Sequence, residues 1–262
     1  RPNMLLIMDP RGQEIELHGE DTIEPTFGLA AKWIDASDRE EAQFRGYTVV
    51  DPATVVTTHL TELVRDHTAD LLSYAETQKL IDELPQEHRR LVDDVVPGQI
   101  PMGGLQRLLQ SLLQERVSIR DMPTILEGVS EAHGFTRNIA LITEHVRSRL
   151  ARQLSHANSG PDGVLKLVAL TPEWENAFAE ALVGEGEEKQ LAMPPSQLQQ
   201  FIEGVRESFD HQALMGETPV LLTSPAIRPY VRSIVERFRP MTCVMSQAEV
   251  HPRARIRTVA QI

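Results

Sequence analysis

The chain has 262 residues, a formal net charge of −12 and a single cysteine. This length exceeds one ordinary small core, so we expect two to four subdomains. The acidic balance argues against nucleic acid as a general partner, and a single cysteine excludes an internal disulfide. No apolar run approaches the ~18 residues that a membrane-spanning helix needs.

The first 50 residues predict short strands in irregular chain. The apolar run 4–8, the run 30–34 with Trp33, and the β-branched run 46–50 after a glycine are typical of strands. The opening residues lack the cleavage site of a signal peptide. Their abrupt, strand-like start is what we expect of a piece cut from a longer protein.

The next hundred residues predict helices. Asp51-Pro52 marks a helix start, because an aspartate side chain accepts from a free backbone N–H and proline fits the first helical position. Apolar residues then recur at helical spacing. The predicted helices begin at Asp51, cover 76–84, 87–96 and 105–115, begin again at Asp121, and cover 139–154.

Helices and strands alternate in the remaining sequence. We expect a loop at 155–163, strands at 164–170, 219–222, 242–246 and 255–260, and helices from Thr171, over 196–215, and from a Ser224 cap to about Phe238. The charged, glycine-bearing segment 184–188 predicts a flexible linker with rapid amide exchange across 184–193. The whole pattern predicts an α+β fold of mixed small α/β modules with a largely helical middle subdomain.

The sequence contains no phosphate-binding loop, dinucleotide fingerprint, nucleophile elbow or paired metal ligands. Gly103-Gly104 opens a helix and could hold a pyrophosphate, although easing a tight turn is the simpler explanation. His59 and His67 are too far apart to share a metal, and Cys243 is best explained as a small core residue. We therefore expect a binding protein without enzymatic activity, cofactor or metal.

Six segments in order form a recognisable set: 24–34, 46–60, 91–98, 105–115, 117–127 and 219–229. Together they resemble the cytoplasmic domain of the flagellar and type III secretion export-gate family, and its flagellar branch fits better than its virulence branch. The resemblance covers almost the whole chain.

The resemblance implies four subdomains. They are residues 1–47 with about 97–116 (truncated at its start), an inserted 48–96, a mainly helical 117–195, and a C-terminal α/β module at 196–262. In that family a membrane part precedes this part, which lies at the cytoplasmic face of the bacterial inner membrane. It assembles as a nine-membered ring and receives flagellar export chaperones with cargo, and other export apparatus proteins.

The resemblance also implies a chaperone cleft between the first two subdomains. Its acidic position falls at or beside Asp70, its bulky apolar position at Leu72, and a third position at Gly103. The family commonly has Gly-Arg-Gln-Glu where this chain has residues 73–76, Ser-Tyr-Ala-Glu. Only the last of these is retained, which puts the partner specificity in doubt. Leu72 is equally well explained as ordinary helix core.

Our leading hypothesis is a docking platform whose grooves bind an amphipathic segment of a chaperone. A virulence-type gate with the same role is the nearest alternative. Two others are a hydrolase or transferase with a site near Gly103-Gly104, and a structural ring component without cargo contact. Chaperone binding and a phosphate-dependent thermal shift distinguish them.

The charge is distributed unevenly. Residues 224–262 contain seven arginines and two acids, a net of +5, which leaves −17 on the rest. Arg253, Arg255 and Arg257 alternate, so a strand would place them on one face. We expect this row to contact acids of a neighbouring copy in a salt-sensitive, head-to-tail ring. Arginines that are solvated or paired within their own subunit are the alternative.

Overall fold

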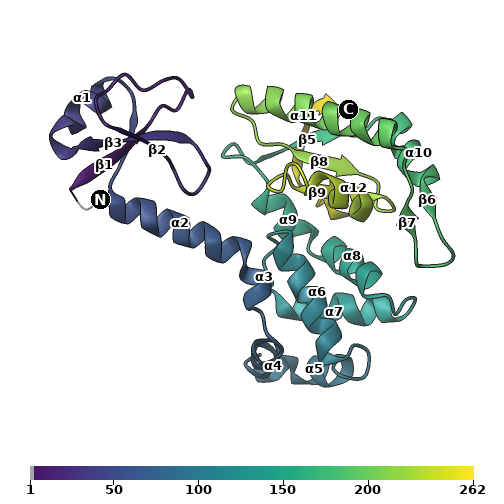
Figure 1. The fold of residues 1–262 in the computed structure, drawn as a ribbon. Coiled ribbons are helices and arrows are strands. Elements are labelled where there is room, and N and C mark those ends of the chain that lie inside the picture. The colour runs from purple at the N-terminus through teal and green to yellow at the C-terminus, as the bar shows by residue number, and fades with distance from the viewer. Residues whose placement is uncertain (1–2) are drawn as a thin grey trace. The chain divides into compact units, whose positions relative to one another are not determined.

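The computed structural model describes residues 3–262, so the residue-1 start of the predicted first subdomain lies outside them (Figure 1). The chain divides into two compact units, Arg1–Leu71 and Leu72–Ile262, called unit 1 and unit 2 below. The predicted α+β class is confirmed, because an antiparallel sheet, a helical middle and a parallel sheet follow one another. The four-subdomain division stays a prediction.

Unit 1 contains a four-stranded antiparallel sheet in the order β2-β3-β1-β4. The strands are β1 (Met4–Met8), β2 (Glu20–Ile23), β3 (Ala30–Asp35) and β4 (Thr48–Val50). Alternating residues of β1 and β3, such as Ile7 and Ile34, form a core with Ala42 of α1 (Arg39–Phe44). The sequence did not predict β2, because this edge strand is mostly exposed and carries two acids.

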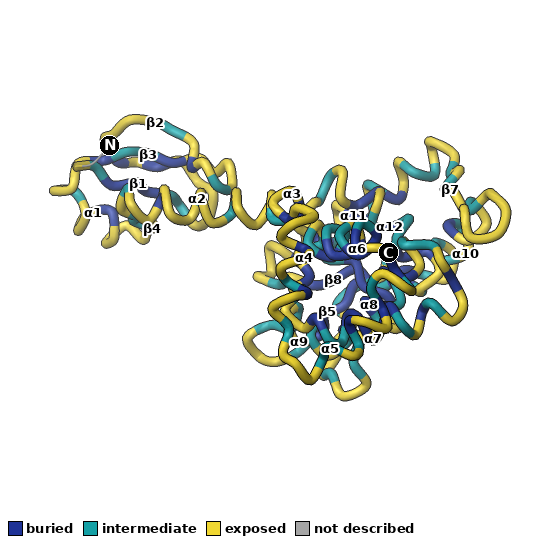
Figure 2. Tube along the Cα trace, turned by 90° about the horizontal axis from the view of Figure 1, so that it is seen from below, coloured by how far each residue is buried: buried dark blue, intermediate teal, exposed yellow. Residues whose placement is uncertain are grey.

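The predicted helix start after β4 is confirmed. The Asp51 side chain accepts from the Thr54 backbone N–H, and α2 (Pro52–Asp66) follows, then α3 (Thr68–Leu71). Of the apolar residues on α2, only Val55 is buried. Figure 2 shows exposed residues along α2. The large apolar residues exposed on this helix are Val56, Leu60, Leu63 and Val64.

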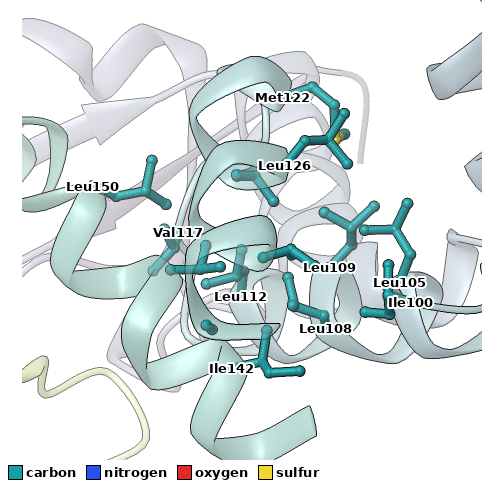
Figure 3. Packing of buried hydrophobic residues seen from close by; sticks show 14 of the residues in the cluster. Ile100, Leu105, Leu108, Leu109, Leu112, Val117, Met122, Leu126, Ile142 and Leu150 are labelled. Carbon is teal, nitrogen blue, oxygen red and sulfur yellow. The ribbon is translucent and has the colours of Figure 1, made fainter. Parts of the chain in front are cut away.

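The helical part of unit 2 surrounds α6, which buries Leu105, Leu108, Leu109 and Leu112 completely (Figure 3) and Leu113 in part. Its helices are α4 (Tyr74–Asp82), η2 (Gln86–His88), α5 (Arg89–Val95), α6 (Met102–Gln114), α7 (Met122–His133), α8 (Ile139–Arg149) and α9 (Ala151–Ala157). The single helix predicted at 139–154 is therefore wrong. It breaks at Leu150, and α9 then extends into the predicted loop at 155–163.

The rest of unit 2 contains a parallel sheet in the order β10-β5-β8-β9. The strands are β5 (Val164–Ala169), β8 (Val220–Thr223), β9 (Val244–Ser246) and β10 (Arg255–Gln261), and the helices are α10 (Pro172–Glu180), α11 (Pro195–Leu214), α12 (Arg228–Val235) and the short η3 (Gln247–Glu249). Phe178 of α10 and Phe201 of α11 lie in a second core with β8 and α12. Burial on both faces explains the continuous apolar runs of β5 and β8.

Two local predictions in unit 2 need correction. Ser224 is no helix cap, because residues 225–227 form a turn and α12 begins only at Arg228. Instead, the Ser224 N–H and Oγ both donate to the Glu175 carboxylate at 2.8 and 2.5 Å. The segment 184–188 is the tip of a hairpin between β6 (Leu182–Val183) and β7 (Gln190–Leu191), not an open linker.

Candidate partner-binding site

Asp70 lies in α3 at the end of unit 1. Its carboxylate is exposed, and its Oδ2 lies 3.1 Å from His67 Nδ1 one turn earlier. An exposed pair of this kind contributes little to stability. Asp70 is therefore a surface carboxylate with no folding role that would compete with partner binding.

Leu72 begins unit 2 and is 7% exposed, in the same core as Ile81 of α4 and Leu109 of α6. Its carbonyl oxygen accepts from the side-chain amides of Gln106 and Gln110, at 3.0 and 3.1 Å. These contacts support the explanation of Leu72 as core. An apolar anchor for a partner has to be accessible, so a contact by Leu72 stays a prediction that its burial does not favour.

Exposed apolar side chains lie on either side of Leu72 in the sequence. Leu71 is 62% exposed and Tyr74 is 56% exposed. Sequence reasoning passed over both because the resemblance pointed to Leu72. Leu72 directly precedes Ser73, whose side chain accepts from the Glu76 N–H as the N-cap of α4. This cap marks a change of chain direction at Leu72, and it is the local signal in the sequence that Leu72 packs differently from Leu71.

Gly103 lies in the first turn of α6 and is half-buried. A Cβ placed on it would have Arg107 Nη1, 3.9 Å away, as its nearest neighbour. Packing therefore does not require a glycine there. Gly104 differs, since its Cβ would come within 3.0 Å of Ile100 and 3.3 Å of Ile139. Close packing of α6 explains the second glycine without a phosphate.

The predicted arginine row is divided by the structure. Arg253 precedes β10, whereas Arg255 and Arg257 belong to it. Arg253 and Arg255 line a hollow of about 740 Å³ on unit 2. Arg257 Nη2 instead donates to Glu217 Oε1 of the same chain at 3.0 Å. Self-association through these arginines stays a prediction, and Arg257 fits the alternative of an internal pair.

A group of charged side chains that the sequence did not reveal lies inside unit 2. Arg228 of α12 donates to both carboxylate oxygens of Glu115, at 2.8 and 2.9 Å, and to both of Glu144, at 2.6 and 2.7 Å. Arg147 of α8 donates to both oxygens of Glu249 at 2.7 and 3.0 Å. We call these five residues the buried charge cluster.

The buried charge cluster connects the helical part of unit 2 to its parallel sheet. Burial alone would raise the pKa of Glu115, but the Arg228 and Arg147 charges outweigh it and lower that pKa. Likewise, burial would lower the pKa of Arg228, but its hydrogen bonds to Glu144 and the Glu115 charge raise it. Both shifts favour the charged forms of Glu115 and Arg228, which makes the cluster a structural arrangement rather than an acid–base pair.

Cys243 precedes β9, and burial raises the pKa of its thiol to about 11. Such a thiol is a poor nucleophile. Within residues 3–262 no group of three or more metal-binding side chains is gathered, and no helix there is long and apolar enough to cross a membrane.

The chain matches the FHIPEP family model over residues 1–255. It belongs to the FHIPEP family. It is 62% identical over 262 residues to the flagellar biosynthesis protein FlhA of Caulobacter vibrioides, covering 100% of this chain and 37% of that protein. The FlhA protein of Bacillus subtilis is 35% identical over 257 residues, covering 98% and 38%. The chain thus spans under two fifths of these relatives, and the predicted resemblance is confirmed.

Solved structures confirm the fold. The Chlamydia pneumoniae CdsV protein superposes with a TM-score of 0.84 at 25% identity, covering 100% of this chain and 76% of that one. The structure described as nonameric EPEC SctV-C gives 0.79 at 22% identity, covering 100% and 78%. At 22% identity, the similarity to SctV-C supports the fold and nothing further.

Proposed function

We propose that this chain is a cytoplasmic docking platform of a flagellar protein-export gate, binding export chaperones with their cargo and other export apparatus proteins. The observation that carries the proposal is the 62% identity to FlhA along the entire chain. The flagellar role is favoured over a virulence-type gate, because the EscV cytosolic domain from the type III secretion system is only 21% identical. Family membership also supports a non-enzymatic role.

We place the platform at the cytoplasmic face of the bacterial inner membrane. The FlhA relatives are much longer than this chain, which leaves ample length in them for a membrane part. A ring of nine copies is the assembly proposed, by analogy with the nonameric SctV-C and EscV cytosolic domain. A complex of CdsV with CdsO supports docking of a further protein on this fold.

The chaperone contact is proposed at Asp70, Leu72 and Gly103. Asp70 offers an exposed carboxylate, and Gly103 offers a surface where added side-chain atoms meet no close neighbour. Leu71 and Tyr74 supply the exposed apolar area that Leu72 lacks. An accessible aromatic beside a charge is a frequent combination in binding hot spots.

Binding of the purified chain to flagellar export chaperones tests the proposal. We expect Gly103→Asp and Asp70→Lys each to weaken binding by at least about tenfold, because each places the wrong group in a desolvated contact. Neither should lower the melting temperature, since both positions are free of tight packing. Glu83→Lys, at an exposed acid ending α4, is the matched control. If the chain binds no flagellar chaperone, the proposed function is contradicted. If it binds one and neither Gly103→Asp nor Asp70→Lys weakens that binding, the chaperone contact lies elsewhere on the chain.

A further inference from the structure

The hollow containing Arg253 and Arg255 is a strongly basic place on an acidic chain. It lies between α7, α8 and α9 on one side and the segment entering β10 on the other. Arg149 and Arg152 also line it, together with His156 and His251, and Asp121 is the one acid among its lining residues in the described part of the chain. Asp121, which accepts from the Thr124 N–H as a helix cap, sets a single carboxylate against four arginines of this lining.

Three of the four arginines that line the hollow have no ion-pair partner among the described residues, whereas Arg149 lies 3.6 Å from Glu127 and 3.5 Å from Glu131. Within residues 3–262 the structure gives no ion pair to the guanidinium groups of Arg152, Arg253 or Arg255, and all three residues are exposed. Gathering like charges without a counter-charge costs free energy. Such an arrangement therefore favours an anionic ligand, above all carboxylates, which guanidinium groups bind in bidentate fashion.

The walls of the hollow are fixed by hydrogen bonds. Ser155 Oγ of α9 accepts from the His251 N–H at 2.8 Å and donates to the Glu249 carbonyl at 3.4 Å. The Arg253 N–H donates to His251 Nδ1 at 3.2 Å, so a neutral His251 ring carries its proton on Nε2. The basic groups from α9 and from the β10 side are thus held together before any ligand arrives.

The same unit carries an acidic projection, the β6–β7 hairpin. Its tip contains Glu185, Glu187 and Glu188, all exposed. The turn requires glycine, since Gly184 has a φ of +127° and a Cβ there would collide with the Glu188 carbonyl oxygen. Glu187 accepts from Thr136 Oγ1 at 2.9 Å, which anchors the hairpin. Glu185 and Glu188 have no ion-pair partner among the described residues.

The hollow and the tip lie apart on unit 2. In Figures 1 and 2, α9 and the β6–β7 hairpin are on opposite sides of this unit. Two different, complementary surfaces on opposite sides are what a head-to-tail assembly needs.

We propose that the hollow is the receptor for the acidic hairpin tip of a second copy of this chain, with Arg253 and Arg255 meeting Glu185 and Glu188 of the neighbour. This inference rests on the self-association in the proposed function, and names the two surfaces that make it. The hollow offers arginines from separate segments, whereas phosphate sites typically gather backbone N–H groups at a glycine-rich turn or helix start. A carboxylate-bearing segment therefore suits it better than a small phosphate.

Exchange of charges between two variants of this 262-residue chain tests the proposal. One variant reverses the tip, Glu185→Arg with Glu188→Arg, and the other reverses the hollow, Arg253→Glu with Arg255→Glu. We expect each variant alone to associate at least about tenfold more weakly than the unaltered chain in sedimentation experiments, because attraction becomes repulsion. An equimolar mixture should regain association, since alternating copies of the two variants join opposite charges at every contact of a dimer, an open chain or an even-numbered ring. A closed ring of nine cannot alternate throughout and would keep one repulsive contact, so recovery is measured as association and not as ring closure.

Controls separate this result from general charge effects. Arg237→Glu and Glu180→Arg change exposed residues outside both surfaces and should leave association unchanged. If the hollow variant melts early, Arg152→Glu on α9 replaces it. The unaltered chain should associate less as salt rises from about 0.05 to 0.5 M.

Each result of these association experiments either supports or overturns the contact between the hollow and the hairpin tip. Loss in both variants with recovery in the mixture supports the contact. A chain that stays monomeric, association indifferent to both reversals, or loss without recovery overturns it. Inorganic phosphate that binds saturably to the hollow without competing with association would do so too. Chaperone binding, measured on the same two variants, should be unchanged, so failure of the docking function is recognised separately.

Discussion

Units 1 and 2 contain helices with the same apolar spacing but opposite burial. On α6 of unit 2, Leu105, Leu108 and Leu112 are completely buried. On α2 of unit 1, Leu60 and Val64 recur at the same helical spacing and are exposed. Periodicity therefore identifies a helix and its apolar face, but it carries no information about what covers that face.

The two units also differ in the charged side chains that they bury. Unit 1 buries one carboxylate, Glu24, which accepts from the backbone N–H groups of Thr26 and Phe27 at 2.9 and 2.7 Å. Unit 2 buries Arg147, Arg228 and Glu249. Charges inside a protein are costly unless every partner is in place. Unit 2 is thus far more sensitive to the loss of a single charged group.

Each unit contains one tryptophan, which makes the comparison measurable. Trp33 lies in β3 of unit 1, and Trp174 packs edge to face on Phe201 in unit 2. A Trp33→Phe background follows unit 2 by fluorescence, and a Trp174→Phe background follows unit 1. Urea unfolding in both backgrounds gives separate free energies.

The largest effect is expected from Arg228→Ala. It leaves Glu115 and Glu144 without their shared guanidinium group, and breaking a buried charge pair by removing one partner costs about 3–5 kcal/mol. The loss should appear in the free energy of unfolding of unit 2 and not in that of unit 1. An equal loss in both units, or none, would contradict the assignment of the buried charge cluster to unit 2.

Leu72→Asp should come next. Because Leu72 is buried, an aspartate there should destabilise unit 2 by about 2–4 kcal/mol through lost packing and a poorly solvated charge. Leu71→Asp is the matched control, one residue earlier and exposed, and should cost less than about 0.5 kcal/mol. Chaperone affinity should be measured only where the fold is retained. A stable Leu72→Asp variant with weakened binding would restore Leu72 as an accessible contact.

Lowering the pH should change the free energies of unfolding of the two units by less unequal amounts than these substitutions do. The pKa of Glu115 is held below its usual 4.5 by arginine charges that outweigh its burial. A lowered pKa means that its stabilisation is present above pH 4.5 and is lost as the pH falls below it. In unit 1 the lowered pKa values of Asp9, Asp35 and Asp51 belong to exposed carboxylates. Glu24 of unit 1 is buried and also has a lowered pKa, because its hydrogen bonds from Thr26 and Phe27 outweigh its burial, but no arginine among the described residues pairs with it as Arg228 pairs with Glu115. Below that pH, unit 2 should therefore lose more stability per pH unit, and Glu115→Gln should flatten its profile.

The sequence predicted much of the fold because many element boundaries are marked locally. Asp51-Pro52 and Asp121 place their helices correctly, since a capping side chain acts within four residues. The predicted helix cap at Ser224 is wrong because the prediction used only residues close to it in the sequence. Ser224 resembles a cap, but Glu175, 49 positions away, takes both of its donors. Capping chemistry is readable in sequence, whereas a distant partner is not.

The candidate site could be predicted only in part. The resemblance supplied Asp70, Leu72 and Gly103, but their exposure depends on packing. Leu71 and Leu72 are the same residue type, and only the structure shows which one faces the core. The buried charge cluster was unreadable, since its partners are separated by up to 113 positions in the sequence.

The smallest effect is expected on the exposed face of α2. Leu60→Ala should change the free energy of unfolding of unit 1 by less than about 0.5 kcal/mol, because Leu60 is 59% exposed and alanine is a good helix former. Val55→Ala, on the same helix but 8% exposed, should cost about 1–2 kcal/mol as the matched control. Leu60→Ala should also reduce binding of a hydrophobic dye, since it removes exposed apolar area. A loss above about 1 kcal/mol for Leu60→Ala would show that this face is covered in solution, and the contrast between α2 and α6 would then disappear.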